Sequence, residues 1–164
     1  MKMVKLSSGE VILTHSQQLT SRECVTFSPN GSFFAAGAHN DPHVGIFDTT
    51  TGELRGSVSL PHTVYSLSWS HCGRWLAAGC GDTKAHIIDT SSYAVAAVLA
   101  GHANRIFCLQ WKPLLLPSSL PNPATASSTD ASSSSLSASF NSVANVRLLT
   151  ASRDCTVRVW KAKI

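Results

Sequence analysis

Residues Val146 to Trp160, VRLLTASRDCTVRVW, decide the fold of this 164-residue chain. They read as two short apolar strands, 146–151 and 155–160, joined by a polar turn at 152–154. The second half alternates and is rich in β-branched residues, which is typical of a pleated, partly buried strand. The sequence therefore predicts a β-hairpin near its end.

The same layout occurs twice earlier, in FFAAGAHNDPHVGIFD from Phe33 and in WLAAGCGDTKAHIID from Trp75. In all three segments an aspartate precedes a large apolar residue by six positions. The strand before each segment carries an aromatic residue, and these lie 42 positions apart in both intervals: Phe27, Trp69 and Trp111. A fixed period of this size is the signature of a propeller or solenoid, in which each repeat forms one supersecondary unit. The chain is therefore predicted to be a β-sheet repeat protein.

The composition is that of a globular protein, with 43% hydrophobic and 13% charged residues. The longest apolar run, Tyr93 to Ala100, is far shorter than the ~20 residues needed to span a bilayer. The start of the chain lacks the apolar core of a secretory signal. The net charge of +4 comes from scattered basic residues rather than from a cluster, so the charge alone does not indicate nucleic-acid binding.

The five cysteines are odd in number and include no CxxC pair. They lie within or beside predicted strands. This usage predicts reduced, buried thiols in an intracellular compartment, cytoplasmic or nuclear.

The third repeat is interrupted by residues 114–145, which are dominated by serine, alanine and proline. Such a segment cannot bury enough apolar surface to fold. We therefore expect a disordered low-complexity insertion between two strands of one sheet. A phosphorylated regulatory segment is the alternative, although no basic or Ser-Pro context indicates a kinase.

These motifs resemble the WD-repeat family of β-propellers, and the third repeat carries the pattern most fully, beginning at Gly101-His102. The resemblance implies an all-β partial propeller of about three four-stranded blades. It also implies a structural tetrad, a chain of hydrogen-bonded side chains that ties a strand to a turn. The tetrad maps onto His102, Thr150, Asp154 and Trp160.

The two earlier repeats keep less of the tetrad. The second keeps His62 and Asp82 as structural turn residues, with Ala78 and Ile88 at the hydroxyl and Trp positions. The first keeps Asp41. It has Ala36 and Phe47 at the other two places.

The period divides the chain into an N-terminal outer strand that could close a ring, residues 1–20, and three WD repeats at 21–60, 61–100 and 101–164. Three blades fall below the four to eight of a typical propeller. Two hypotheses follow: the chain is a fragment or isoform of a longer propeller, or two copies form a head-to-tail homodimer. Because propellers usually lie in a single chain, the fragment is favoured.

No motif predicts catalysis, because the chain has no glycine-rich phosphate loop, GxSxG elbow or HExxH pair. His39 and His43 flank Asp41 in HNDPH, but a metal site needs three or four ligands, so a solvated loop is expected. A histidine and an aspartate placed by the repeat would satisfy buried polar groups rather than perform chemistry. No catalytic residue, metal or cofactor is predicted, and the chain is expected not to be an enzyme.

The resemblance implies a non-catalytic scaffold that docks partner proteins or peptides on its propeller faces, with no membrane partner. Polar side chains on one face are the expected contacts: Arg22, His39, Lys84, Asn104, Arg105 and Arg153. Their basic character favours an acidic or phosphorylated peptide. The alternative is an assembly factor associated with RNA or ribonucleoprotein, as some WD-repeat proteins are.

Overall fold

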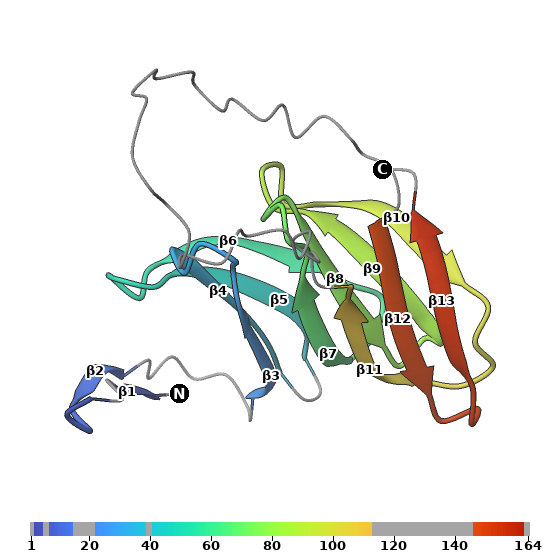
Figure 1. Ribbon diagram of the computed structural model, residues 1–164, viewed down its shortest axis with the longest axis horizontal. Coiled ribbons are helices and arrows are strands. Elements are labelled where there is room, and N and C mark those ends of the chain that lie inside the picture. Colours follow the sequence, from blue (N-terminus) through green and yellow to red (C-terminus); the bar gives the residue numbers. More distant parts are fainter. Residues whose placement is uncertain (1, 5–6, 15–21, 39–40, 113–145, 163–164) are drawn as a thin grey trace, which may run out of the picture.

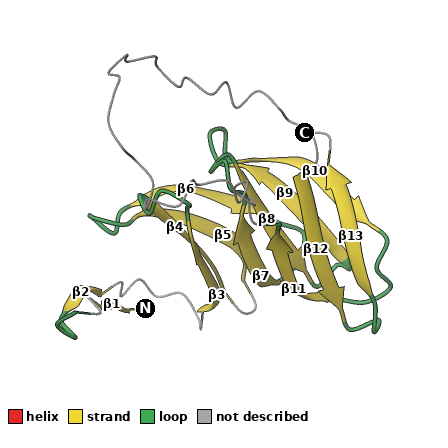
Figure 2. Ribbon diagram, viewed as in Figure 1, coloured by secondary structure: helices red, strands yellow, loops and turns green. Residues whose placement is uncertain are grey.

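A computed structural model provides the structure of the chain and confirms the all-β expectation. It describes residues 2–4, 7–14, 22–38, 41–112 and 146–162. Within these ranges it contains thirteen β-strands in four antiparallel sheets and no helix, hence no helix able to cross a membrane (Figure 1, Figure 2). The predicted insertion at 114–145 and the candidate contact His39 lie outside the described residues.

Two four-stranded sheets share one topology, in which each strand pairs with its neighbours in chain order. The first consists of β3 (Arg22–Phe27), β4 (Phe33–Ala38), β5 (Asp41–Asp48) and β6 (Leu54–Ser59). The second consists of β7 (Val64–Trp69), β8 (Trp75–Cys80), β9 (Lys84–Asp89) and β10 (Ala94–Ala100). This is the strand order of a propeller blade.

The third sheet has three strands in the described part of the chain, ordered β11-β12-β13. They are β11 (Ile106–Trp111), β12 (Val146–Ser152) and β13 (Val157–Ala162). The predicted hairpin is present, but its turn lies later than expected and includes Cys155, which has a φ of 65°. The shift arises because the Ser152 amide donates to the Thr156 carbonyl (3.2 Å), so that β12 continues through Ser152.

The N-terminal segment forms a separate hairpin of β1 (Lys2–Val4) and β2 (Val11–Thr14). The sequence predicted one outer strand within residues 1–20, whereas the structure has two. The connecting turn places Gly9 at a φ of 69°, a conformation that glycine adopts without steric cost. In the described residues β2 pairs with β1, and no strand lies beside the outer edge of β13.

Neighbouring sheets pack face to face, with their first strands β3, β7 and β11 in contact (Figure 1). We call the face that packs on the following sheet the trailing face and the opposite one the leading face. Between the first two sheets, one buried cluster joins trailing residues of β4 and β5 to leading residues of β7: Ala35, Val44, Ile46, Val64, Leu67 and Trp69. Between the next two, the same positions recur: Ala77, Ala85, Ile87, Ile106, Leu109 and Trp111.

Glycine permits the closest approach in both contacts. A Cβ atom on Gly37 would lie 3.2 Å from the Val64 Cβ, and one on Gly79 would lie 2.9 Å from the Ile106 Cγ2. Residues 37 and 79 are 42 positions apart, so the period that spaces the strands also spaces the contacts between sheets.

The thiols are less buried than the sequence predicted. Only Cys80 is fully buried, and burial raises the pKa of its thiol. Cys24 is half-buried, whereas Cys72, Cys108 and Cys155 are exposed. This exposure has a local cause. Cys72 and Cys155 lie in turns, and Cys108 is on the face of β11 that points away from the second sheet, where no other sheet packs within the described residues.

Substituting Gly79→Ala should lower the free energy of unfolding by about 1–3 kcal/mol, because the added methyl group overpacks the contact between the second and third sheets. Urea denaturation followed by tryptophan fluorescence measures this change. Ser57→Thr, which adds one methyl group on the exposed strand β6, should stay within about 0.5 kcal/mol of the native chain. Equal stability of the two variants would contradict a close contact at Gly79.

Candidate functional site

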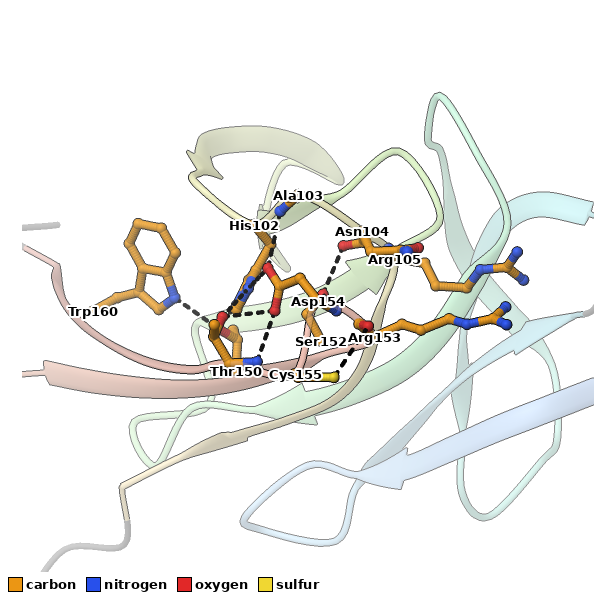
Figure 3. Close-up of polar contacts among 11 residues, drawn as sticks. His102, Ala103, Asn104, Arg105, Thr150, Ser152, Arg153, Asp154, Cys155 and Trp160 are labelled. Atoms are coloured by element: carbon orange, nitrogen blue, oxygen red, sulfur yellow. Dashed lines mark hydrogen bonds and ion pairs between the residues drawn. The ribbon is translucent and has the colours of Figure 1, made fainter.

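Four side chains of the third repeat form a continuous hydrogen-bonded chain (Figure 3). The Trp160 Nε1 donates to the Thr150 Oγ1 at 2.8 Å. The same oxygen lies 2.8 Å from the His102 Nε2, and the His102 Nδ1 lies 2.8 Å from the Asp154 Oδ2. His102 and Thr150 are buried. The structure thus brings together the four residues that the resemblance assigns to a structural tetrad.

The hydrogen bonds of the tetrad can all run in one direction, so that each N–H and O–H group of the four side chains donates. An indole N–H can only donate, and an ionised carboxylate can only accept. The Thr150 hydroxyl then accepts from Trp160 and donates to the His102 Nε2, while the His102 Nδ1–H donates to Asp154. No polar atom of the four side chains is left without a partner, which is the condition for burying them at little cost.

Asp154 links the tetrad to the backbone of two segments, the loop before β11 and the turn after β12. Its Oδ2 accepts the Ala103 amide at 2.9 Å. Its Oδ1 accepts the Thr156 amide at 2.9 Å and the Thr156 hydroxyl at 2.6 Å. The Thr156 hydroxyl, followed by the Ala103 amide and His102, holds the pKa of the Asp154 carboxyl well below its usual range, although burial opposes this shift.

Two more hydrogen bonds join the loop before β11 to the turn after β12. The Ser152 hydroxyl donates to the Asn104 carbonyl at 2.8 Å, and the Arg153 amide donates to the Arg105 carbonyl at 3.0 Å. Figure 3 shows both arginine side chains extending away from the tetrad in the same direction. Three of the sequence-predicted contact residues, Asn104, Arg105 and Arg153, are therefore neighbours.

Arg105 also bridges the second and third sheets. Its Nη1 donates to the Tyr65 hydroxyl at 3.2 Å, and its guanidinium lies 5.7 Å from the Tyr65 ring centroid and 5.9 Å from that of Phe107. The two rings are 5.2 Å apart in an edge-to-face arrangement. Tyr65 and Phe107 were not predicted as contact residues, although their spacing of 42 positions places them at equivalent points of β7 and β11.

Neither Arg105 nor Arg153 forms an ion pair with a carboxylate among the described residues. Other arginines of this part of the chain do. Arg55 lies 2.8 Å from Asp48, whose pKa it lowers. Arg74 lies 3.1 Å from Asp89, whose pKa is lowered to about 2, chiefly by the Ser91 hydroxyl.

The remaining predicted contact residues are not part of this group. Lys84 is exposed, at the corresponding turn of the second sheet, where its amide donates to the Asp82 Oδ1 at 3.2 Å. Arg22 begins β3, where the structure describes its backbone alone. In the first repeat Asp41 accepts the His43 amide at 2.9 Å, as expected of a turn aspartate.

In the second repeat Asp82 has a different histidine partner from the expected His62. The His86 Nε2 lies 2.9 Å from the Asp82 Oδ2, and the His86 side chain is buried. The exposed His62 instead packs against Gly81, and its Nδ1 accepts the Thr63 amide at 2.9 Å. His86 was not predicted as a partner of Asp82, and its only signal in the sequence is its position four residues after this aspartate.

A second feature absent from the sequence analysis is a group of three potential metal ligands. One ligand atom each from Cys80, Asp82 and His86 lies within 4.8 Å of the others. These side-chain types bind zinc, but a closed structural site has four protein ligands. The hydrogen bond between Asp82 and His86 already pairs two of the three groups.

The lowered pKa of Asp154 predicts an acid-labile third sheet. The unfolded chain protonates this carboxyl near pH 4, at about the ordinary pKa of an aspartate, whereas the folded chain does so only at lower pH. Protons therefore favour the unfolded state, and stability should fall as the pH drops from about 4 toward 2. Asp154→Asn should destabilise the chain at pH 7 and flatten this acid limb, measured as the urea midpoint against pH.

Arg153→Gln is the control. It removes a charge from the same turn, but the Arg153 side chain has no hydrogen bond to Asp154, so this variant should lose stability with falling pH as the native chain does. An Asp154→Asn variant with an unchanged acid limb would show that other carboxyl groups control acid unfolding.

Two family models match the sequence. One describes the WD40 domain of anaphase-promoting complex subunit 4 and matches residues 59–113. The other describes the WD domain, G-beta repeat, and matches residues 10–48 and 126–161. Between them they cover all three repeats.

Among curated proteins, guanine nucleotide-binding protein subunit beta-2 of Caenorhabditis elegans is 30% identical over 139 residues, covering 83% of this chain and 29% of that protein. WD repeat-containing protein 1 of Gallus gallus is 34% identical over 105 residues, covering 59% of this chain and 17% of that protein. The chain thus spans less than a third of the length of either relative.

Among solved structures, the WD40 repeats of RRP9 align with a TM-score of 0.64 at 16% identity, over 93% of this chain and 38% of that one. At this identity the likeness shows the fold alone, and it confirms the partial propeller. Sequence models, relatives and fold agree: the chain belongs to the WD-repeat family of β-propeller proteins.

Proposed function

We propose that the chain is a non-catalytic interaction scaffold that docks an acidic or phosphorylated peptide segment of a partner protein. The docking site is the basic face, which we define as Asn104, Arg105 and Arg153 together with Tyr65 and Phe107. One observation supports it above the others. Arg105 and Arg153 lie on two loops joined by hydrogen bonds, their side chains extend in the same direction, and neither has a carboxylate partner among the described residues.

The composition of the basic face suits an anionic peptide. Guanidinium groups bind carboxylates and phosphates in bidentate geometry. The exposed Phe107 ring offers apolar contact beside them, and arginine and aromatic residues dominate binding hot spots. The hydrogen bond to the Tyr65 hydroxyl and the cation-π contacts with Tyr65 and Phe107 restrain the Arg105 side chain, which reduces the conformational entropy lost on binding.

The tetrad supports a structural rather than a catalytic role. Both ring nitrogens of His102 are hydrogen-bonded, and the side chain is fully buried. A general base must reach the proton that it abstracts from a substrate, and this imidazole faces Thr150 and Asp154 instead. We therefore assign His102 to holding the loop of the basic face.

We also propose an intracellular location, in the cytoplasm or nucleus. Cys72, Cys108 and Cys155 are exposed thiols without a disulfide, and exposed thiols persist in reducing compartments.

A fluorescent peptide rich in glutamate, with and without a phosphoserine, tests the proposal by anisotropy titration against the 164-residue chain. We expect saturable binding that Arg105→Gln and Arg153→Gln each weaken by roughly tenfold, in line with the loss of a charged hydrogen bond. Arg55→Gln removes an exposed arginine that already pairs with Asp48, and it should bind like the native chain.

A labelled single-stranded RNA serves as the competing ligand. Tighter binding of this RNA than of the peptide, with a steep dependence on salt concentration, would replace the proposal by the ribonucleoprotein alternative. Equal loss of peptide binding in Arg55→Gln would show that net charge, and not the basic face, attracts the peptide.

A further inference from the structure

The turn between β8 and β9 brings together a thiol, a carboxylate and an imidazole. Cys80 ends β8, Asp82 lies in the turn, and His86 is the third residue of β9. Ala78 pairs with His86 across the two strands, and residues two apart on a strand share a face. Cys80 and His86 therefore lie on the same face of the second sheet, with Asp82 at the end of that face.

The three ligand atoms lie close to the separations that a tetrahedral zinc ion requires. One ligand atom from each residue lies within 4.8 Å of the other two. The His86 Nε2 lies 2.9 Å from the Asp82 Oδ2. Zinc bonds of about 2.0–2.3 Å in tetrahedral geometry put the ligand atoms about 3.3–3.6 Å apart, so side-chain shifts of about 1 Å admit the ion.

The surroundings of the three residues suit an ion that enters from solvent. Cys80 and His86 are buried, whereas the Asp82 side chain is 17% exposed. An ion can therefore reach the two buried ligands past Asp82. The Lys84 amide donates to the Asp82 Oδ1 at 3.2 Å, which orients the carboxylate so that its Oδ2 faces His86.

The repeat does not account for this combination of side chains. By strand register, Gly45 and Arg158 take the place of His86 in the first and third sheets. Ser152 takes the place of Cys80 in the third sheet. A turn aspartate needs only a histidine partner to satisfy its carboxylate, so the repeat explains neither the thiol nor its burial beside the pair.

We propose that Cys80, Asp82 and His86 bind a zinc ion, with a water molecule in the fourth position. Thiolate and imidazole ligands favour zinc over magnesium and calcium, which prefer oxygen ligands. Three protein ligands and one water complete a four-coordinate set. None of the three residues belongs to the basic face, so a failure of this proposal leaves the proposed peptide binding untouched, and the reverse holds as well.

The ion takes the place of the proton that His86 shares with Asp82. An ionised carboxylate can only accept, so the His86 Nε2 carries the hydrogen before the ion binds. On binding, the Cys80 thiol releases its proton to solvent, and the imidazole hydrogen moves from Nε2 to Nδ1. The sulfur and the Nε2 lone pair then bond to the ion, and one proton leaves the chain for each zinc ion bound.

Titration of the reduced 164-residue chain with Co²⁺, a spectroscopic substitute for zinc, tests the proposal. We expect a thiolate-to-cobalt charge-transfer band together with the visible bands of tetrahedral cobalt. These bands should saturate at one ion per chain and disappear when zinc is added. A chain that gives neither kind of band overturns the proposal.

Variants assign the ligands. Cys80→Ser and His86→Gln should each weaken Co²⁺ binding by at least about tenfold, because even residues that only orient a metal ligand contribute 10–100-fold. Cys72→Ser removes an exposed thiol from the turn between β7 and β8. His43→Gln removes a histidine that pairs with another turn aspartate, Asp41. Both controls should bind Co²⁺ like the native chain.

Circular dichroism establishes that each variant is folded before its affinity is compared. Unchanged Co²⁺ binding in a folded Cys80→Ser or His86→Gln variant overturns the proposal, as does an equal loss in Cys72→Ser. X-ray absorption of the zinc-loaded native chain gives a test that needs no variant. It should show one sulfur neighbour among nitrogen and oxygen neighbours, and a spectrum with no sulfur or with more than one contradicts the site.

Discussion

The organisation of the third sheet depends on two hydrogen bonds that share the Thr150 hydroxyl group. It is buried and joins the indole of Trp160 on β13 to the imidazole of His102 in the loop before β11. The imidazole in turn reaches Asp154, which accepts amides from its own turn and from the loop. The tetrad therefore holds the loop and the turn together. The guanidinium groups of the basic face extend from the backbone of this loop and this turn.

The first two sheets lack this hydrogen-bonded tetrad, and apolar packing takes its place in them. In the second sheet Ile88 is buried where β13 has Trp160, and Asp82 is satisfied by His86. In the first sheet the Phe34 and Phe47 rings stack with centroids 5.1 Å apart. The common requirement is a filled space between the middle strands, with an aspartate that satisfies the amides of the turn.

Much of the fold could be predicted from the sequence, because hydrophobic alternation and the 42-residue period both follow from the geometry of a repeated sheet. The tetrad of His102, Thr150, Asp154 and Trp160 was predicted from the resemblance to the WD-repeat family, because the period alone does not say which side chains occupy these positions. The pairing of His86 with Asp82 could not be predicted from the pattern. In a straight strand these side chains would lie too far apart for a hydrogen bond, and they meet because Asp82 lies in the turn before β9. The cluster of Tyr65, Arg105 and Phe107 was likewise missed, since it forms between sheets whose relative placement no local pattern records. Burial of the thiols was overestimated for a related reason: within the described residues, no sheet packs on the face of β11 that carries Cys108.

The free energy of unfolding of Thr150→Val and Thr150→Ser, measured by urea denaturation, tests most directly whether this hydroxyl holds the sheet together. Valine matches the shape of threonine but leaves the His102 Nε2 and the Trp160 Nε1 without a partner, so we expect a loss of about 1–3 kcal/mol. Serine keeps the hydroxyl and should lose less than about 1 kcal/mol, for the missing methyl group alone. A valine variant as stable as the serine variant would contradict the central claim that the shared hydroxyl organises the third sheet.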